Sequence, residues 1–210
     1  MSQNLEIDIY TGGSVFTNGY LLRLENGQVI VIDAPEGIAK WLQDRTVNVA
    51  ALLLTHVHYD HIQGAAEMKA AFDMPIYSHS QPDDDLTLKS VVEAAYGMAL
   101  DIKEFQVDHF LEGETSVTPI KGQKFTILHV PGHSPDSLCF QPKGSSVLFG
   151  GDVLFEGGLG RSDFPHGDGD LLVRGIREKI LSLPDETMVF PGHGSATTVA
   201  VERDTNPFLR

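Results

Sequence analysis

The chain has 210 residues, which is enough for one well-buried domain and cramped for two, so we expect a single domain over residues 1–210. Hydrophobic residues make up 41% of the chain and charged residues 21%, an ordinary globular composition that argues against disorder. The formal net charge of −14 would repel a phosphate backbone, so we expect no nucleic-acid partner.

The first residues and the single cysteine bear on where the protein works. Residues 1–6 lack the basic and apolar segments of a secretory leader. No apolar run approaches the roughly 18 residues needed to cross a bilayer, so no membrane association is expected. Cys139 is the only cysteine, which excludes an intrachain disulfide, and it lies in a predicted strand as a small core residue. These features together predict a cytoplasmic protein.

In the first half of the chain, β-rich runs and amphipathic stretches follow one another. Residues 20–25 and 28–33 are joined by Asn26-Gly27, which predicts a β-hairpin. Residues 50–54 and 75–78 predict two further strands. Two helices are predicted from apolar residues at helical spacing, Ile62, Ala65, Ala66, Met68 and Phe72 for the first and Leu88, Val91, Val92, Ala95 and Met98 for the second. The acidic residues 83–85 are expected at the N-terminus of the second helix.

The second half repeats this arrangement. Strands are predicted over residues 124–130, 137–140, 146–150 and 188–190. A helix ended by Pro184 is predicted from the inward-facing residues Leu172, Val173, Ile176, Ile180 and Leu183, and a last helix is expected near residues 197–203. Two β-rich halves, each with helices, favour an α+β chain with two packed sheets and helices on the outer faces.

A dense group of metal-ligand residue types follows the strand predicted over residues 50–54, in the sequence Thr-His-Val-His-Tyr-Asp-His of residues 55–61. In an extended segment, alternation points His56 and His58 to the same side, while Asp60 and His61 fall at the turn into a helix. Imidazole and carboxylate donors suit zinc, iron or manganese. Because no cysteine ligand is present, an open catalytic site is favoured over a closed structural zinc site.

Three further donors are placed alike. His133, Asp152 and His193 each come at the C-terminal end of a predicted strand and next to a glycine, which lets the backbone approach closely. Donors at equivalent strand ends can converge on one edge of a sheet.

The pattern H-x-H-x-D-H, followed by separate His, Asp and His residues, resembles the metallo-β-lactamase superfamily over nearly the whole chain. The resemblance implies a four-layer αββα sandwich. It also implies two divalent metal ions, which we expect to be zinc, with iron or manganese as alternatives. By this resemblance the ligands would be His56, His58 and His133 for the first ion, Asp60, His61 and His193 for the second, and Asp152 for both.

The resemblance further implies a hydrolase in which a metal-bridging hydroxide cleaves a small thioester or ester, with Asp60 orienting the nucleophile. A thioester is favoured because a thiolate departs without a strong general acid, and no dedicated acid stands out. Residues 158–164, 191–194, 202–203 and 206–207 resemble glyoxalase II, and in particular the short bacterial type related to hydroxyacylglutathione hydrolase.

That likeness concerns the substrate as well. In such relatives a basic residue at the position of Arg161 engages the glycine carboxylate of glutathione, so the substrate would be like S-lactoylglutathione. The alternative for Arg161 is an ion pair with Asp163 or Asp168 in its own loop. Glyoxalase II enzymes carry Glu-Tyr after the last histidine ligand, where this chain has Gly194-Ser195.

Two other activities stay open at this point. A persulfide dioxygenase would use one iron, bound by His56, His133 and Asp152. A lactonase is the second, and acyl-homoserine lactones would test it. A non-catalytic binding protein would be expected to have lost ligands, and none of the seven is missing. The native substrate and the oligomeric state are left undecided by the sequence.

Overall fold

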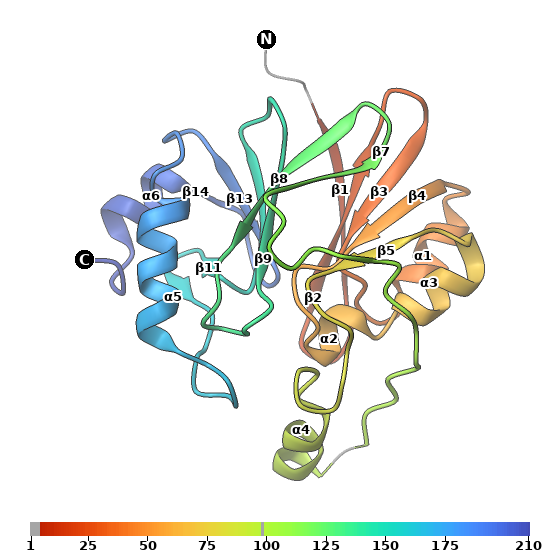
Figure 1. Ribbon diagram of the computed structural model, residues 1–210, viewed down its shortest axis with the longest axis horizontal. Helices are drawn as coiled ribbons and strands as arrows, with labels where there is room; N and C mark the ends of the chain where they lie inside the picture. The colour runs from red at the N-terminus through yellow and green to blue at the C-terminus, as the bar shows by residue number, and fades with distance from the viewer. Residues whose placement is uncertain (1–4, 98) are drawn as a thin grey trace. The chain divides into compact units, whose positions relative to one another are not determined.

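A computed structural model describes residues 5–97 and 99–210 of the chain. It contains two compact units, an N-terminal unit (Leu5–Glu112) and a C-terminal unit (Gly113–Arg210), each with its own six-stranded sheet (Figure 1). Met98, part of a predicted helix, and residues 1–4, part of the segment in which no secretory leader is expected, lie outside the described residues. Among the described residues, no helix is both long enough and apolar enough to cross a bilayer.

The sheet of the N-terminal unit combines an antiparallel and a parallel part. Its strands, in their order across the sheet, are β1 (Glu6–Gly12), β2 (Thr17–Arg23), β3 (Gln28–Ile32), β4 (Asn48–Leu53), β5 (Ile76–Ser78) and β6 (His109–Phe110). Strands β1 to β3 are antiparallel, whereas β3 to β6 run parallel. The predicted hairpin is confirmed as β2–β3, with Tyr20 opposite Ile32 and Gly27 at a φ of 80° in the turn.

Four helices belong to this unit: α1 (Ile38–Asp44), α2 (Tyr59–Ile62), α3 (Ala65–Phe72) and α4 (Lys89–Tyr96). Helices α1 and α3 pack on one face of the sheet, where Leu42 and Met68 join a core with Val31 and Leu52 (Figure 1). The first predicted amphipathic stretch forms α2 and α3.

The acidic residues 83–85 do not begin helix α4, so that part of the prediction was wrong. The helix begins at Lys89, and Leu88 before it has a φ of 58°, a left-handed conformation through which an α-helix cannot continue. The carboxylate of Asp83 instead accepts a hydrogen bond from the Leu86 amide at 2.8 Å, in a turn that precedes the helix.

The sheet of the C-terminal unit is also mixed. Its strands, in their order across the sheet, are β14 (Thr197–Thr198), β13 (Met188–Pro191), β10 (Val147–Gly151), β9 (Leu138–Pro142), β8 (Gln123–His129) and β7 (Ser116–Ile120). A separate short hairpin is formed by β11 (Leu154–Phe155) and β12 (Gly158–Leu159). The four strands predicted in this half are confirmed as β8, β9, β10 and β13.

Helix α5 (Gly169–Gly175) continues into a π-helix, η1 (Ile176–Ile180), and α6 (Val199–Thr205) lies near the end of the chain. Helix α5 begins where the Asp168 carboxylate accepts a hydrogen bond from the Leu171 amide, at 2.8 Å. The predicted inward-facing residues Leu172 and Ile176 pack in one core with Cys139. Cys139 is fully buried, so the prediction of a small core residue is confirmed, and this burial raises the pKa of its thiol to about 12.

Both sheets are apolar on two faces. In the N-terminal unit, Leu22 and Ile30 are fully buried on the face opposite α1 and α3. In the C-terminal unit, Phe125 and Phe149 are fully buried and lie outside the core formed with α5. A sheet with two apolar faces must be covered on both, and the αββα architecture requires sheets of this kind.

Candidate metal-binding residues

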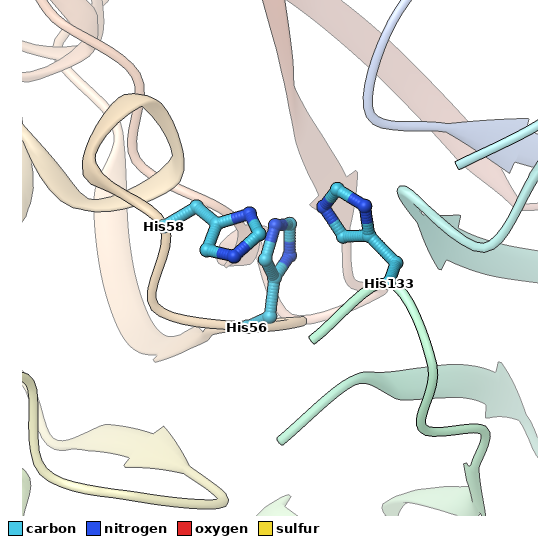
Figure 2. A group of neighbouring side chains, drawn as sticks. All are labelled: His56, His58 and His133. Carbon is cyan, nitrogen blue, oxygen red and sulfur yellow. The ribbon is translucent and has the colours of Figure 1, made fainter. Parts of the chain in front are cut away.

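Four of the predicted ligands lie in the N-terminal unit, at the carboxyl end of β4. His56 and His58 belong to the segment between β4 and α2, and Asp60 and His61 to the single turn of α2. The rings of His56 and His58 meet edge to face with centroids 4.5 Å apart (Figure 2). The centroid of His56 is also 4.1 Å from that of His61. The local sequence therefore places four side chains with nitrogen or oxygen ligand atoms in the short segment from His56 to His61.

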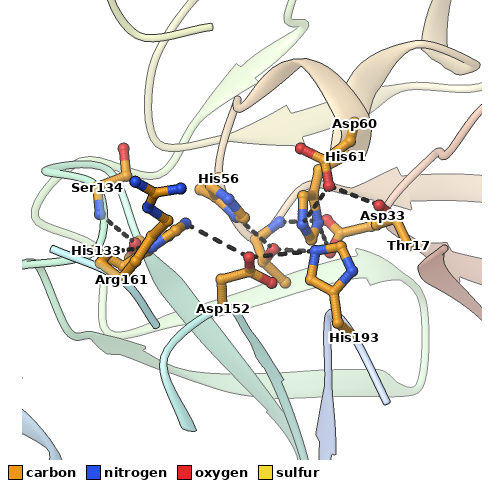
Figure 3. Close-up of polar contacts among 12 residues, drawn as sticks. Thr17, Asp33, His56, Asp60, His61, His133, Ser134, Asp152, Arg161 and His193 are labelled. Atoms are coloured by element: carbon orange, nitrogen blue, oxygen red, sulfur yellow. Dashed lines mark hydrogen bonds and ion pairs between the residues drawn. The ribbon is translucent and has the colours of Figure 1, made fainter. Parts of the chain in front are cut away.

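Asp33 is a site residue that the sequence did not single out. It follows β3, the parallel neighbour of β4, so the two strands end at the same edge. Its carboxylate accepts hydrogen bonds from the amide and hydroxyl of Thr55, each at 2.7 Å, and lies 2.8 Å from His61 Nδ1 (Figure 3). Because a carboxylate only accepts, Nδ1 carries a proton, and Nε2 is the ring nitrogen left to bind a metal ion. The sequence does carry a signal for Asp33, a carboxylate directly after an apolar strand, which is the same signal that marked Asp152.

Asp60 faces that same nitrogen. One of its oxygens, Oδ2, accepts a hydrogen bond from the Thr17 hydroxyl at 2.6 Å and lies 3.5 Å from Nε2 of His61 (Figure 3). With Asp33 bound to the other ring nitrogen, Nε2 of His61 and a carboxylate oxygen of Asp60 face each other. A metal ion between these two atoms would be attracted to both of them. The donors of this unit therefore fit a divalent metal ion.

The other three predicted ligands lie in the C-terminal unit, at one edge of its sheet. Strands β8 and β10 are both antiparallel to β9, and β13 is parallel to β10, so β8, β10 and β13 all end at that edge. His133, Asp152 and His193 follow these strands in turn. Asp152 Oδ2 lies 3.5 Å from Nε2 of His133 and 3.4 Å from Nε2 of His193 (Figure 3). The structure thus brings these three donors together, as their equivalent places in the chain predict.

His133 is oriented in the same manner as His61, although by a backbone group. Its Nδ1 lies 2.7 Å from the carbonyl oxygen of Arg161, which can only accept a hydrogen bond (Figure 3). Nδ1 therefore carries a proton, and Nε2 is the ring nitrogen that faces Asp152. Metal-binding histidines commonly donate their second ring N–H to a carboxylate or a carbonyl in this way. The donors of the C-terminal unit fit a metal ion on the same grounds.

Glycine allows the backbone to pass close to these ligands. A Cβ atom at Gly160 would lie 1.8 Å from the carbonyl oxygen of Asp152 and 3.1 Å from Cβ of His133. Gly132, next to His133, has a φ of 133°, and a Cβ there would lie 2.5 Å from the carbonyl oxygen of Asp168. The close approach predicted for the glycine beside His133 is therefore present, and Gly160 likewise leaves no room for a side chain.

Arg161 forms an ion pair with Asp163, one of the two partners that the sequence suggests for it. Its Nε and Nη2 each donate to an Asp163 oxygen at 2.8 Å, and its guanidinium lies 3.8 Å from the ring centroid of Phe164. The hydrogen bonds from Arg161 lower the pKa of Asp163. Asp168 instead caps α5. The two-pronged contact with Asp163 has the geometry with which arginine binds any carboxylate.

Comparison with known proteins agrees with the ligand pattern. A family model described as the metallo-β-lactamase superfamily matches residues 12–193. Hydroxyacylglutathione hydrolase GloC of Haemophilus influenzae is 39% identical over 175 residues, which cover 83% of this chain and 82% of that protein.

Two solved structures are similar over almost their full length. The crystal structure of BLEG-1 B3 metallo-β-lactamase has a TM-score of 0.88 at 34% identity and covers 97% of this chain and 99% of that one. The structure of TTHA1623 in a di-iron-bound form has a TM-score of 0.81 at 35% identity and covers 96% and 100%. The predicted metallo-β-lactamase fold is confirmed, and this chain belongs to the metallo-β-lactamase superfamily.

Proposed function

We propose that the protein is a dinuclear-metal-dependent hydrolase that cleaves a small thioester like S-lactoylglutathione, or a related ester. The proposed ligands are His56, His58 and His133 for one ion, Asp60, His61 and His193 for the other, and Asp152 for both. One observation carries the proposal. Asp33 and the Arg161 carbonyl accept hydrogen bonds from Nδ1 of His61 and His133, so Nε2 of each ring is the nitrogen turned toward a metal-ligand carboxylate, 3.5 Å away in both cases.

The remaining residues of the proposed centre orient reactants. Divalent cations bound by such donors supply hydroxide at neutral pH and polarise an acyl carbonyl. Asp60 has one oxygen held by the Thr17 hydroxyl, which limits rotation of the carboxylate. From that fixed position Asp60 accepts a hydrogen bond from the attacking water and orients it. This makes Asp60 both a proposed ligand and a catalytic residue.

A thioester suits these residues better than an amide does. An amine leaving group needs a proton from a general acid, whereas a thiolate leaves without one. The likeness to hydroxyacylglutathione hydrolase GloC supports a glutathione thioester. Arg161 is proposed to bind a substrate carboxylate by exchanging its contact with Asp163, whose two oxygens it already binds in a matching geometry.

Zinc is the proposed metal, because imidazole and carboxylate donors suit it well. The same donors also accept iron or manganese. The similarity to TTHA1623, solved in a di-iron-bound form, supports iron as the alternative. Metal content is therefore measured without assuming the element.

The test combines elemental analysis of the purified protein with an assay of S-lactoylglutathione hydrolysis. We expect two metal ions per chain and release of the thiol. The substitution His58→Ala should reduce the rate at least 100-fold while the far-UV circular dichroism spectrum stays unchanged, because a ligand is lost and the strands are not.

His109→Ala is the matched control, because His109 is exposed and stacks on Tyr77. It should hydrolyse the substrate at the rate of the unsubstituted protein. Retained turnover in His58→Ala would contradict the proposed role of the ligand cluster.

A further inference from the structure

Glu202, on α6 in the C-terminal unit, is a fully buried carboxylate that the proposed chemistry does not use. Its oxygens accept three hydrogen bonds, from the Thr197 hydroxyl at 2.6 Å, the Asn206 side-chain amide at 2.7 Å and the Gly157 backbone amide at 3.1 Å. Burial of a carboxylate is costly unless donors surround it. The carboxylate therefore fixes three donors from different segments in one place.

One of these bonds, and a further bond from Asn206, reach the β11–β12 hairpin. Gly157 lies in the turn of this hairpin, and the Asn206 amide, besides its bond to Glu202, donates to the carbonyl oxygen of Gly158 at 3.1 Å. The turn is thus anchored through both a donor and an acceptor. Strands β11 and β12 have two residues each, and a hairpin of this length does not persist without outside contacts.

The other end of the hairpin adjoins the ligands of this unit. It begins shortly after Asp152 and ends shortly before Arg161, whose carbonyl oxygen receives the Nδ1 proton of His133. The ring of Phe155, on β11, meets the ring of His193 edge to face with centroids 6.2 Å apart. Two of the three proposed ligands of the C-terminal unit therefore contact the hairpin or its flanking residues, and the third, Asp152, shortly precedes β11 in the chain.

We infer that Glu202 and Asn206 are positioning residues: by anchoring the β11–β12 turn, they hold the Arg161 carbonyl against His133 and keep that imidazole in the orientation that binds metal. The last step rests on the proposed function, whereas the effect on the His133 hydrogen bond does not. Loss of such an outer contact commonly weakens metal binding about 10- to 100-fold.

The test compares Glu202→Gln with Arg203→Gln. Glutamine keeps the size of Glu202 but turns an amide toward groups that are themselves donors. Arg203, the next residue of α6, binds Asp185 and the carbonyl oxygens of Leu181 and Leu183, all outside the hairpin. Both substitutions should lower the free energy of unfolding, but only Glu202→Gln should change the orientation of the proposed ligand His133.

Two measurements separate positioning from general destabilisation. The first is the Nδ1 proton resonance of His133 in the metal-free protein, and the second is zinc affinity by competition with a chelator. In Glu202→Gln we expect this resonance to broaden and zinc affinity to fall about 10-fold or more. In Arg203→Gln both should match the unsubstituted protein. Unchanged values in Glu202→Gln, or equal losses in both variants, would overturn the inference.

Two further outcomes are separable. If Glu202→Gln does not fold, Thr197→Val removes one donor at nearly constant shape and should shift both measurements in the same direction. If it does not, the inference is wrong. If the unsubstituted protein binds no zinc, iron or manganese, the proposed function fails, and the His133 resonance still decides whether Glu202 positions that ring.

Discussion

Asp33 and the Arg161 carbonyl oxygen act on two histidines in the same way, although one is a side chain and the other a backbone group. Each accepts a hydrogen bond from Nδ1 and thereby leaves Nε2 as the ring nitrogen that can bind a metal ion beside a neighbouring carboxylate. The seven proposed ligands could be named from the sequence because their residue types and order are visible there, and their role as ligands stays a prediction. Asp33 was within reach of the same reasoning, since it ends an apolar strand. The Arg161 carbonyl was not, because every residue carries one.

The role of Asp33 predicts the effect of Asp33→Asn. One amide oxygen cannot serve the Thr55 amide, the Thr55 hydroxyl and the His61 ring together, and the new NH2 group faces donors. We expect zinc affinity, measured by chelator competition, to fall about 10- to 100-fold. Asp44→Asn is the control, because Asp44 is exposed and pairs only with Lys40 among the contacts described for it. Equal affinity in both variants would show that Asp33 does not orient the ligand.

Gly160 and Gly158 provide a matched pair of substitutions in one segment. Alanine at Gly160 would collide with the Asp152 backbone, whereas a Cβ at Gly158 meets only Cβ of Phe155, at an ordinary 3.7 Å. We therefore expect Gly160→Ala to lower the free energy of unfolding by about 1–3 kcal/mol and to abolish stoichiometric metal binding. Gly158→Ala should retain both properties. Denaturant unfolding and elemental analysis provide the measurements, and normal metal content in Gly160→Ala would be incompatible with the close approach seen here.

At the scale of elements, prediction succeeded where a pattern is long or a turn is strongly specified. The β2–β3 hairpin, β4, and helices α3 and α5 follow from hydrophobic spacing and from Asn26-Gly27. The strands β6, β11 and β12 have two residues each, too few for any periodicity. Strand β6 forms by pairing with the distant strand β5, and β11 and β12 pair only with each other. Strand β1 was also missed: it lies at the edge of its sheet and leaves Ile9 51% exposed.

Asp108 joins two elements of the N-terminal unit and predicts a pH effect on stability. Its carboxylate accepts hydrogen bonds at 2.7 Å from Lys69 of α3 and from the Ile76 amide of β5. Burial raises the pKa of Asp108, but these hydrogen bonds lower it by more, so the pKa lies below its ordinary value of 3.8. Because the pKa of Asp108 is lower in the folded state than in the unfolded state, its charge stabilises the protein at pH values above the unfolded-state pKa. This contribution is lost as the pH falls through the folded-state pKa.

Asp108→Asn should therefore cost about 1 kcal/mol at pH 7, since the group is partly exposed and its ion pair is screened. The difference from the unsubstituted protein should shrink below about pH 4, as the aspartic acid takes up its proton. Urea unfolding of both proteins at pH 7 and pH 3 measures it. A difference that stays constant between the two pH values would rule out a contribution from the charge.

At the scale of the whole molecule, the ligand pattern is divided between the units, four positions in the first and three in the second. Each unit by itself orients its donors with partners of its own, Asp33 in one and the Arg161 carbonyl in the other. The family match over residues 12–193 takes in parts of both. A single domain over residues 1–210 and a cytoplasmic location stay predictions from the sequence, as does the absence of a nucleic-acid partner from the net charge of −14.

The central claim is that both sets of donors are needed for hydrolysis. It is tested most directly by adding zinc or iron in steps to metal-free protein while thiol release from S-lactoylglutathione and oxygen uptake are recorded together. We predict that thiol release rises to a plateau at two equivalents of metal per chain, with no oxygen consumed. A plateau at one equivalent of iron, accompanied by oxygen uptake, would contradict the account and favour a dioxygenase.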